Sequence, residues 1–358
     1  MVTRKGILLN LFWGFFWSLC LIWPAYSQEE WRLVKVGRMM LDFGQRDPME
    51  FRRLVVDQRG ALYFASRDRI LKFDAHGKQE LEIEMGRYGV ALLEDLDVDG
   101  DDHLVVAGTW EDSGRDVTSR VLIFNHEGAL IASFDRPKFL VKRVVATNGD
   151  ELFLVGVQPP SSLIPPFHVR LRVLKLGFDG EVRGVFGERE MSVSESARYW
   201  QPFLGVVKDA CFLVEDRGDA ALLRTFAPGD GALLRSIEIS FPHSSMPEEV
   251  AGAAQPHHVT PQVRIDRFLP LSSRWALITG GTTYTWRPDD APGQMRSVYR
   301  VFIVSTEKGY LAPVQKEVGG VVKTVGEDGF VYLVSSVVTS QKVRLQVTKA
   351  KLHPPVSN

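Results

Sequence analysis

The chain has 358 residues, of which 45% are hydrophobic and 24% charged, a composition typical of a globular protein with a sizeable core. Its 43 basic and 44 acidic residues nearly cancel, so no overall field draws it to nucleic acid or to an anionic membrane. The composition therefore excludes extensive disorder and argues against a nucleic-acid partner.

The N-terminal segment has the features of an export signal. Two basic residues precede an apolar run from Ile7 to Trp23, and small residues follow at Ala25 and Ser27. This pattern predicts a signal peptide over residues 1–27 and a periplasmic or secreted protein. The alternative is an uncleaved anchor, which would be the sole membrane contact, because a run of about 17 residues is at the short limit for crossing a bilayer.

Segments with alternating apolar and polar residues recur over residues 28–352, and no stretch sustains a helical stripe, which predicts a nearly all-β domain. The first unit has strands at Arg53–Asp57, Ala61–Ala65 and Arg69–Asp74 and a last strand that reaches Met85. Second strands of later units are expected at His103–Ala107, Glu151–Val155, Ala210–Val214, Trp275–Thr279 and Gly329–Val334. Third strands are expected at Arg120–Phe124, Arg172–Leu176, Ala221–Thr225, Arg300–Val304 and Lys342–Gln346. Glycines that need a positive φ follow the third strands at Gly77, Gly128, Gly180, Gly231 and Gly309.

About six such units predict an all-β, six-bladed β-propeller with four-stranded antiparallel blades. The sixth unit ends after three strands near Val347, while a spare strand at about residues 31–43 precedes the first unit. We therefore expect the N-terminal strand to complete the last blade and close the ring. Residues 353–358 would form a short tail, and the protein would be a monomer.

The first unit resembles an NHL repeat. It has an Asp57-to-Gly60 turn, an aromatic strand, the sequence Arg69-Ile70-Leu71-Lys72-Phe73 and a second turn from Asp74 to Gly77. The match drifts in the fourth and fifth units, but as a pattern it covers most of the mature chain. The resemblance implies a propeller of the NHL-like or TolB-like type and leaves the function open.

Turn lengths differ between the two faces of the expected ring. Long insertions fall on the face where inner strands begin, at Thr109–Ser119, Gln158–His168, Gly187–Gln201, Phe241–Gln262 and Gly281–Ser297. Long loops of this kind are commonly functional, so this long-loop face is the candidate binding face.

Cations stand near the starts of the inner strands on that face, chiefly Arg53, Arg87, Lys142 and Arg264, with Arg143, Arg267 and Lys323 nearby. If they converge, they favour a small anionic ligand or an acidic segment of a protein partner. The alternative is that they are ordinary surface charges.

Aromatic residues in the long loops, Trp110, Trp200 and Trp286, offer contact area for a partner or simply pack the loops onto the blades.

The acidic segment with Asp95, Asp97 and Asp99 resembles the calcium loops of integrin-type FG-GAP repeats. His103 stands where that family places its closing carboxylate, so the alternative is a solvated acidic hairpin. No other cofactor is expected, because His243, His257 and His258 lack the spacing of a transition-metal site.

No catalytic motif stands out, and Cys211 reads as a buried apolar residue with no disulfide partner. The leading hypothesis is an exported, non-enzymatic propeller that binds a protein partner or a ligand through its long-loop face. The alternative is a metal-dependent lactonase or other hydrolase acting in the central channel, for which Asp266 is one possible channel acid.

Overall fold

The computed structural model describes residues 31–354 apart from 45, 52, 111–117, 160–167, 193–201, 218–219, 242–259, 287–293, 317–318 and 339–342. The expected signal peptide lies outside the described residues, as do Trp200, the three histidines of the fourth long insertion and most of the tail. Of Trp286 only the backbone is described. Among the described residues, no helix is both long enough and apolar enough to cross a membrane.

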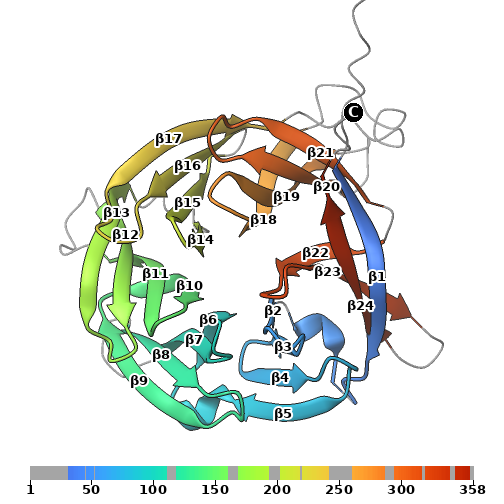
Figure 1. The fold of residues 1–358 in the computed structure, drawn as a ribbon, viewed down its shortest axis with the longest axis horizontal. Coiled ribbons are helices and arrows are strands. Elements are labelled where there is room, and N and C mark those ends of the chain that lie inside the picture. Colours follow the sequence, from blue (N-terminus) through green and yellow to red (C-terminus); the bar gives the residue numbers. More distant parts are fainter. Residues whose placement is uncertain are drawn as a thin grey trace, which may run out of the picture.

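Antiparallel four-stranded units stand around a central axis like the blades of a propeller (Figure 1). Blade one comprises β2 (Arg53–Val56), β3 (Leu62–Ala65), β4 (Arg69–Phe73) and β5 (Gln79–Glu84), and blade two β6 (Leu92–Val98), β7 (Leu104–Trp110), β8 (Thr118–Phe124) and β9 (Leu130–Pro137). Blade three comprises β10 (Leu140–Thr147), β11 (Glu151–Gln158), β12 (His168–Gly177) and β13 (Val182–Ser192), and blade four β14 (Phe203–Val207), β15 (Ala210–Asp216), β16 (Ala220–Phe226) and β17 (Leu233–Ser240). Blade five comprises β18 (Thr260–Pro270), β19 (Trp275–Trp286), β20 (Gln294–Ser305) and β21 (Leu311–Lys316), and blade six β22 (Val321–Val325), β23 (Val331–Val338), β24 (Val343–His353) and β1 (Trp31–Leu41).

The N-terminal strand closes the ring, as predicted. β1 lies antiparallel to β24, from the pair Arg32–His353 to the pair Leu41–Leu345, and so forms the outer strand of blade six. The same strand also runs parallel to β21 over three residues, which joins blades five and six into one eight-stranded sheet. This parallel contact was not predicted. The six-bladed propeller with a composite last blade is therefore confirmed.

The turn between the third and fourth strands contacts the neighbouring blade. The five glycines predicted for these turns all have positive φ, between 69° and 88°. A Cβ on Gly180 would lie 2.7 Å from the Phe134 ring on β9, and one on Gly231 would lie 2.7 Å from Phe186 on β13. In each case the contact is to the outer strand of the preceding blade. Glycine is therefore needed both for the turn and for the packing between blades.

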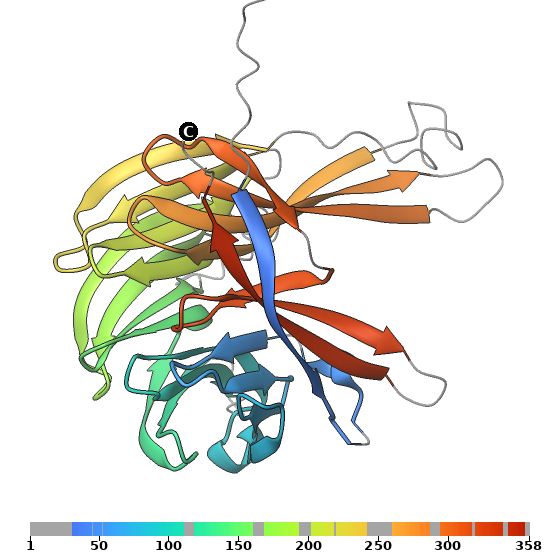
Figure 2. The same cartoon turned by 45° about the vertical axis from the view of Figure 1, so that its right-hand side comes forward.

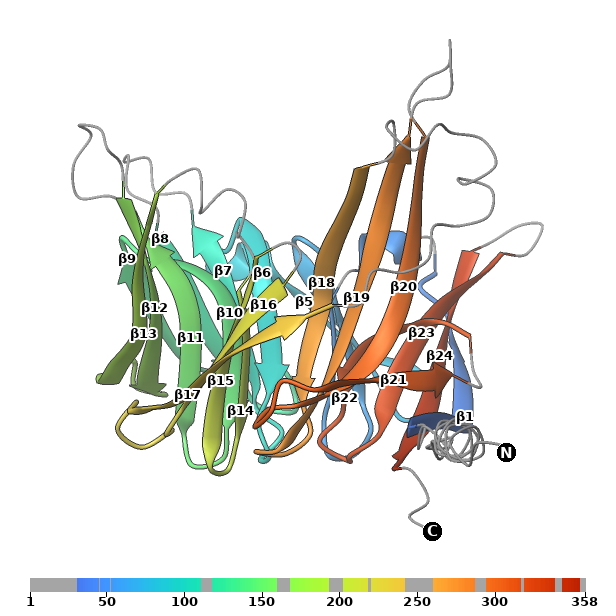
Figure 3. The ribbon, with the colours of Figure 1, turned by 90° about the horizontal axis from the view of Figure 1, so that it is seen from above.

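Some strands are longer than the sequence pattern suggests. The segment Gly281–Ser297 was expected to be a loop, but most of it continues β19 and β20, which project beyond the ring as a long hairpin (Figures 2 and 3). The Gly280–Gly281 pair looks like a turn in the sequence. Within the sheet, however, a Cβ on Gly280 would approach the Arg264 carbonyl oxygen to 2.9 Å, so close strand pairing requires this glycine.

The core lies between the blades, where apolar side chains of successive sheets interdigitate. Cys211 is fully buried between blades three and four, beside Leu213 and Phe226, and burial raises the pKa of its thiol to about 12. It is therefore an unreactive packing residue, as predicted.

Candidate binding site in the central channel

A cavity of about 1010 Å³ occupies the central channel, and residues of all six inner strands line it. These strands are β2, β6, β10, β14, β18 and β22, which surround the axis of the ring in Figure 1. Each inner strand begins on the long-loop face, so its first residues line one end of the channel and its last residues the other. Position along an inner strand therefore measures depth in the channel.

Four of the inner strands contain a β-bulge. The pairing shifts by one residue at Glu94 in β6, Lys142 in β10, Asp266 in β18 and Lys323 in β22. A bulge bends its strand and re-aims the neighbouring side chains. In β6, β10 and β18 the bulge residue is charged and four or five paired residues follow it; in β22 the bulge residue is Lys323, and only two paired residues follow it, so Lys323 lies deeper in the channel. The bulges thus help to bring charged residues of four inner strands to the channel wall.

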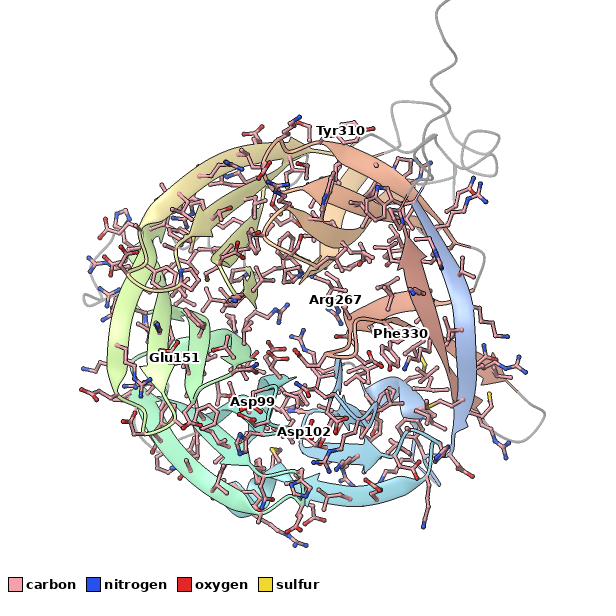
Figure 4. The ribbon with its side chains drawn as sticks, in the orientation of Figure 1. Asp99, Asp102, Glu151, Arg267, Tyr310 and Phe330 are labelled. Carbon is pink, nitrogen blue, oxygen red and sulfur yellow. The ribbon has the colours of Figure 1, made fainter. Side chains whose placement is uncertain are left out.

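Five of the cavity-lining charges are together called the charged ring. They are Arg53, Asp95, Arg143, Arg267 and Lys323. Four are cations and one is an acid. The Arg53 Nε atom lies 3.5 Å from Asp95 Oδ1, and Arg267 lies beside the centre of the channel (Figure 4). The ring therefore has an excess of positive charge.

Two flanking acids balance part of this charge. Glu94 Oε1 lies 3.5 Å from Lys142 Nζ, and this pair is largely buried. Burial raises the pKa of Asp266, while the nearby cations Arg267, Arg264 and Lys323 oppose that rise. Asp266 is thus a counter-ion within a group of cations.

The cations of the ring influence one another. Burial lowers the pKa of Arg143 to about 10, and the charges of Arg53 and Arg267 add to this effect while Asp95 opposes it. Burial also lowers the pKa of Arg267 and that of Lys323. The charge of Arg53 lowers both pKa values further, and the charge of Arg267 lowers the pKa of Lys323. Because these like charges lower each other's pKa, they lie close together. An anion placed among them would reduce the repulsion between the cations.

An apolar layer lies next to the charged ring, deeper in the channel. Two residues after Arg53, Arg143, Arg267 and Lys323, the same strands place Val55, Val145, Leu269 and Val325 on the cavity wall. These four side chains, called the apolar collar, are only half-buried although they are aliphatic.

Asp97 lies at the depth of the collar on β6, and the bare backbone of Gly205 on β14 completes the layer. Asp97 Oδ2 accepts the Ala146 N–H at 2.9 Å. Burial raises the pKa of Asp97 to about 8, and the charges of Asp95 and Glu327 contribute. Its carboxyl group is therefore largely neutral at neutral pH, so the layer carries little charge.

Of the four cations expected near the starts of the inner strands, three lie in or beside the charged ring and one lies away from the channel. Arg53 lies in the charged ring, Lys142 is buried beside it, and Arg264 is exposed but close enough to act on Asp266. Arg87 is not at the channel. It lies in the short 3-10 helix η2 (Met85–Tyr88), where its side chain is 74% exposed and pairs with Glu84 at 2.9 Å.

Of the expected aromatic contacts, Trp110 can be placed with its side chain. The Arg120 guanidinium lies over its ring, 4.8 Å from the centroid, and is itself held by Asp135 at 2.7 Å. Trp110 thus packs the end of β7 onto β8, consistent with the structural alternative.

The carboxyl groups of the three aspartates in the expected calcium loop accept hydrogen bonds from backbone N–H groups of the chain. Asp95 Oδ2 accepts the Val144 N–H at 3.1 Å, and Asp97 makes the equivalent contact to Ala146, so both bind the next blade. Asp99 lies in the β6–β7 turn, where it accepts the backbone N–H groups of Asp101 and His103. Calcium binding stays a prediction.

No family model and no curated protein matches the chain. Solved structures with a similar fold include the WD40 domain of Neurospora crassa Pan2, at 9% identity and a TM-score of 0.46, covering 92% of this chain and 97% of that one. A DUF4221 family member from Bacteroides vulgatus has 13% identity and a TM-score of 0.44 over 91% and 99% of the chains. A gluconolactonase from Xanthomonas campestris has 12% identity and a TM-score of 0.42 over 88% and 98%. These likenesses concern the propeller fold alone, and the NHL-like or TolB-like type stays a prediction.

Proposed function

We propose that the chain is an exported, non-enzymatic propeller of the NHL-like or TolB-like type that binds an anionic ligand in its channel. The observation that supports this proposal is the group of four cations, from four different blades, around a cavity of about 1010 Å³. The ligand would be a small anion or an acidic segment of a protein partner that enters from the long-loop face.

The physical basis is the low solvation of the ring. Arg143 is only 8% exposed, and the other three cations of the ring are half-buried, so water screens their charges less than at an open surface. Arginine also binds carboxylate or phosphate through two parallel N–H groups. An anion that enters the ring accepts these hydrogen bonds, and its negative charge offsets the repulsion between the cations.

The arrangement of the acids favours binding over metal-dependent hydrolysis. Asp266, the one possible channel acid considered for a hydrolase, lies among three cations, which disfavour a metal ion at that place. Within the described part of the chain, the one group of three side chains with metal-like spacing is Asp99, Asp101 and His103, in the β6–β7 turn.

Neutral substitutions test the proposal best. The Arg267→Gln and Lys323→Gln variants remove one charge each without adding a carboxylate. Replacing Lys142 by Glu would instead place a second acid against Glu94 in a buried position and destabilise the fold. The control is Lys78→Gln, because Lys78 is an exposed cation on the opposite face. Arg59 is less suitable there, since its side chain pairs with the buried Asp102 at 2.8 Å.

Calorimetric titration with citrate and with a hexaglutamate peptide should detect binding by wild type that weakens steeply with added salt. Each channel variant should lose roughly tenfold in affinity, as expected for one charge-assisted contact, while the control retains wild-type affinity. Binding that ignores salt, or that weakens equally in the control, would contradict the proposal. Turnover of a lactone or ester panel would support the hydrolase instead.

A further inference from the structure

We infer that the channel ligand is an organic acid with an apolar body, whose carboxylate lies in the charged ring and whose body contacts the apolar collar. This inference rests on the proposed anion-binding function and narrows its ligand class. It follows from the two adjacent layers of the channel wall, which differ in chemistry.

The spacing of the two layers is set by strand geometry. Residues two apart in a strand lie on the same face, about 6.6 Å from each other. Arg143 and Val145 on β10 have this relationship, as do Arg267 and Leu269 on β18. A molecule held by its carboxylate in the ring would therefore place its next few atoms against the collar.

The apolar wall continues deeper on one side of the channel. Val207 on β14 and Leu271, just after β18, line the cavity two residues beyond Gly205 and Leu269. Blades four and five thus offer an apolar strip about 13 Å long, measured from the ring. On the other side Thr147 and Glu327 lie at that depth. An extended chain would follow the strip of blades four and five.

The collar side chains leave apolar surface accessible in the cavity. Leu54, Val144, Phe268 and Val322, which neighbour collar or ring residues along the inner strands, are almost fully buried, whereas the collar side chains pack against the core between the blades and remain partly exposed. Covering them would gain about 25 cal/mol for each Å² of apolar surface removed from water. Asp97, the acid at this depth, has one carboxyl oxygen that accepts the Ala146 N–H at 2.9 Å.

The collar also distinguishes between anions. An acidic peptide would bring backbone N–H and C=O groups against aliphatic side chains, where they would lose their hydrogen bonds to water. An inorganic anion would fill the ring and leave the collar unchanged. A monocarboxylate with an alkyl or aryl body satisfies both layers.

Titration with the straight-chain series acetate, butanoate, hexanoate and octanoate tests the inference, with sulfate and octanol as controls. The affinity should rise about three- to fourfold for each methylene that reaches the collar. The Leu269→Gln variant should flatten this dependence on chain length and keep the salt dependence. Val145→Thr, which preserves side-chain shape, should do the same if Leu269→Gln lowers the melting temperature. Arg267→Gln should instead weaken all acids by a similar factor.

The outcomes separate the two proposals. If sulfate and acetate bind with salt dependence and as tightly as octanoate, the inference is wrong and the anion-binding function stands. If no member of the series binds with salt dependence while citrate does, the inference also fails. If octanol binds as tightly as octanoate, or neither citrate nor any acid binds, the anion-binding function itself is contradicted.

Discussion

The side chain of Asp97 on β6 accepts the backbone N–H of Ala146 on β10 at 2.9 Å, so the inner strand of one blade holds the inner strand of the next. Asp95 makes the equivalent contact to Val144 at 3.1 Å. The two carboxyl groups thus link blades two and three at the channel wall. Because burial raises the pKa of Asp97 to about 8, this link involves a group that titrates near neutral pH.

Stability should therefore depend on pH through Asp97. The folded protein keeps this proton up to about pH 8, whereas the unfolded chain releases it near the ordinary value of 3.8. The contribution of Asp97 to the free energy of unfolding is thus largest below about pH 4 and is lost as the pH rises toward 8. Asp97→Asn should reduce the fall in urea midpoint between pH 5 and pH 8. The Glu127→Gln variant, at an exposed turn, should keep the wild-type fall, and an unchanged fall for Asp97→Asn would contradict the prediction.

The closing strand should make a large contribution to stability. Leu41 on β1 is fully buried with Phe43 and Phe73, whereas Val36 on the same strand is 55% exposed. Leu41→Ala should lower the free energy of unfolding by about 2–5 kcal/mol, through lost burial and an unfilled cavity. Val36→Ala should change it by less than about 0.5 kcal/mol. Chemical denaturation checks both, and equal small effects would show that β1 is not part of the core.

The buried Glu215 should be essential for the contact between blades three and four. Its two oxygens lie 2.5 Å from Arg189 Nη1 and 2.6 Å from Arg224 Nη2, and its side chain is 3% exposed. Glu215→Gln would leave the two arginines without their shared counter-ion, at a cost of about 3–5 kcal/mol. Glu190→Gln, which breaks an exposed pair with Arg170, should cost less than about 1 kcal/mol. Denaturant midpoints that fail to separate these variants would refute the assignment.

Blade-to-blade packing at the turns can be tested through two glycines. Gly180 has φ of 80° and would place a Cβ against Phe134, whereas Gly149 has φ of 88° and open space around it. Both alanine substitutions carry the backbone cost of a positive φ, about 1–2 kcal/mol. Gly180→Ala should cost a further 1–3 kcal/mol, roughly, from overpacking. Equal losses in melting temperature would mean that the turn does not pack on the neighbouring blade.

The repeat was predictable because its signals are local. The strand expected at Ala210–Val214 is β15, Ala210–Asp216, since alternation and turn residues mark a strand without knowledge of its partners. Arg87 was misplaced because the chain forms a short 3-10 helix before the inner strand of blade two begins at Leu92. The length of the β19–β20 hairpin was missed because Gly280, which resembles a turn residue, is required there by strand pairing.

The charged ring could be predicted only in part. Neighbouring charges such as Lys142 and Arg143 would point to opposite faces of a regular strand, so alternation alone does not assign one of them to the channel. The bulges that settle the matter arise from the pairing of two strands. The apolar collar carries a signal that was not used, namely an aliphatic residue two positions after each of Arg53, Arg143, Arg267 and Lys323.

The composite last blade has a consequence for how the chain folds. Each of the first five blades consists of consecutive strands, so each can form from local hairpins soon after its residues are synthesised. β1 is made before all of them, yet its partners β21 and β24 are made last. The first strand must therefore remain unpaired until nearly the whole domain has left the ribosome. Ring closure is then a late step with a high cost in loop entropy, and until it occurs the nascent chain exposes an unpaired β-edge to which other chains can add.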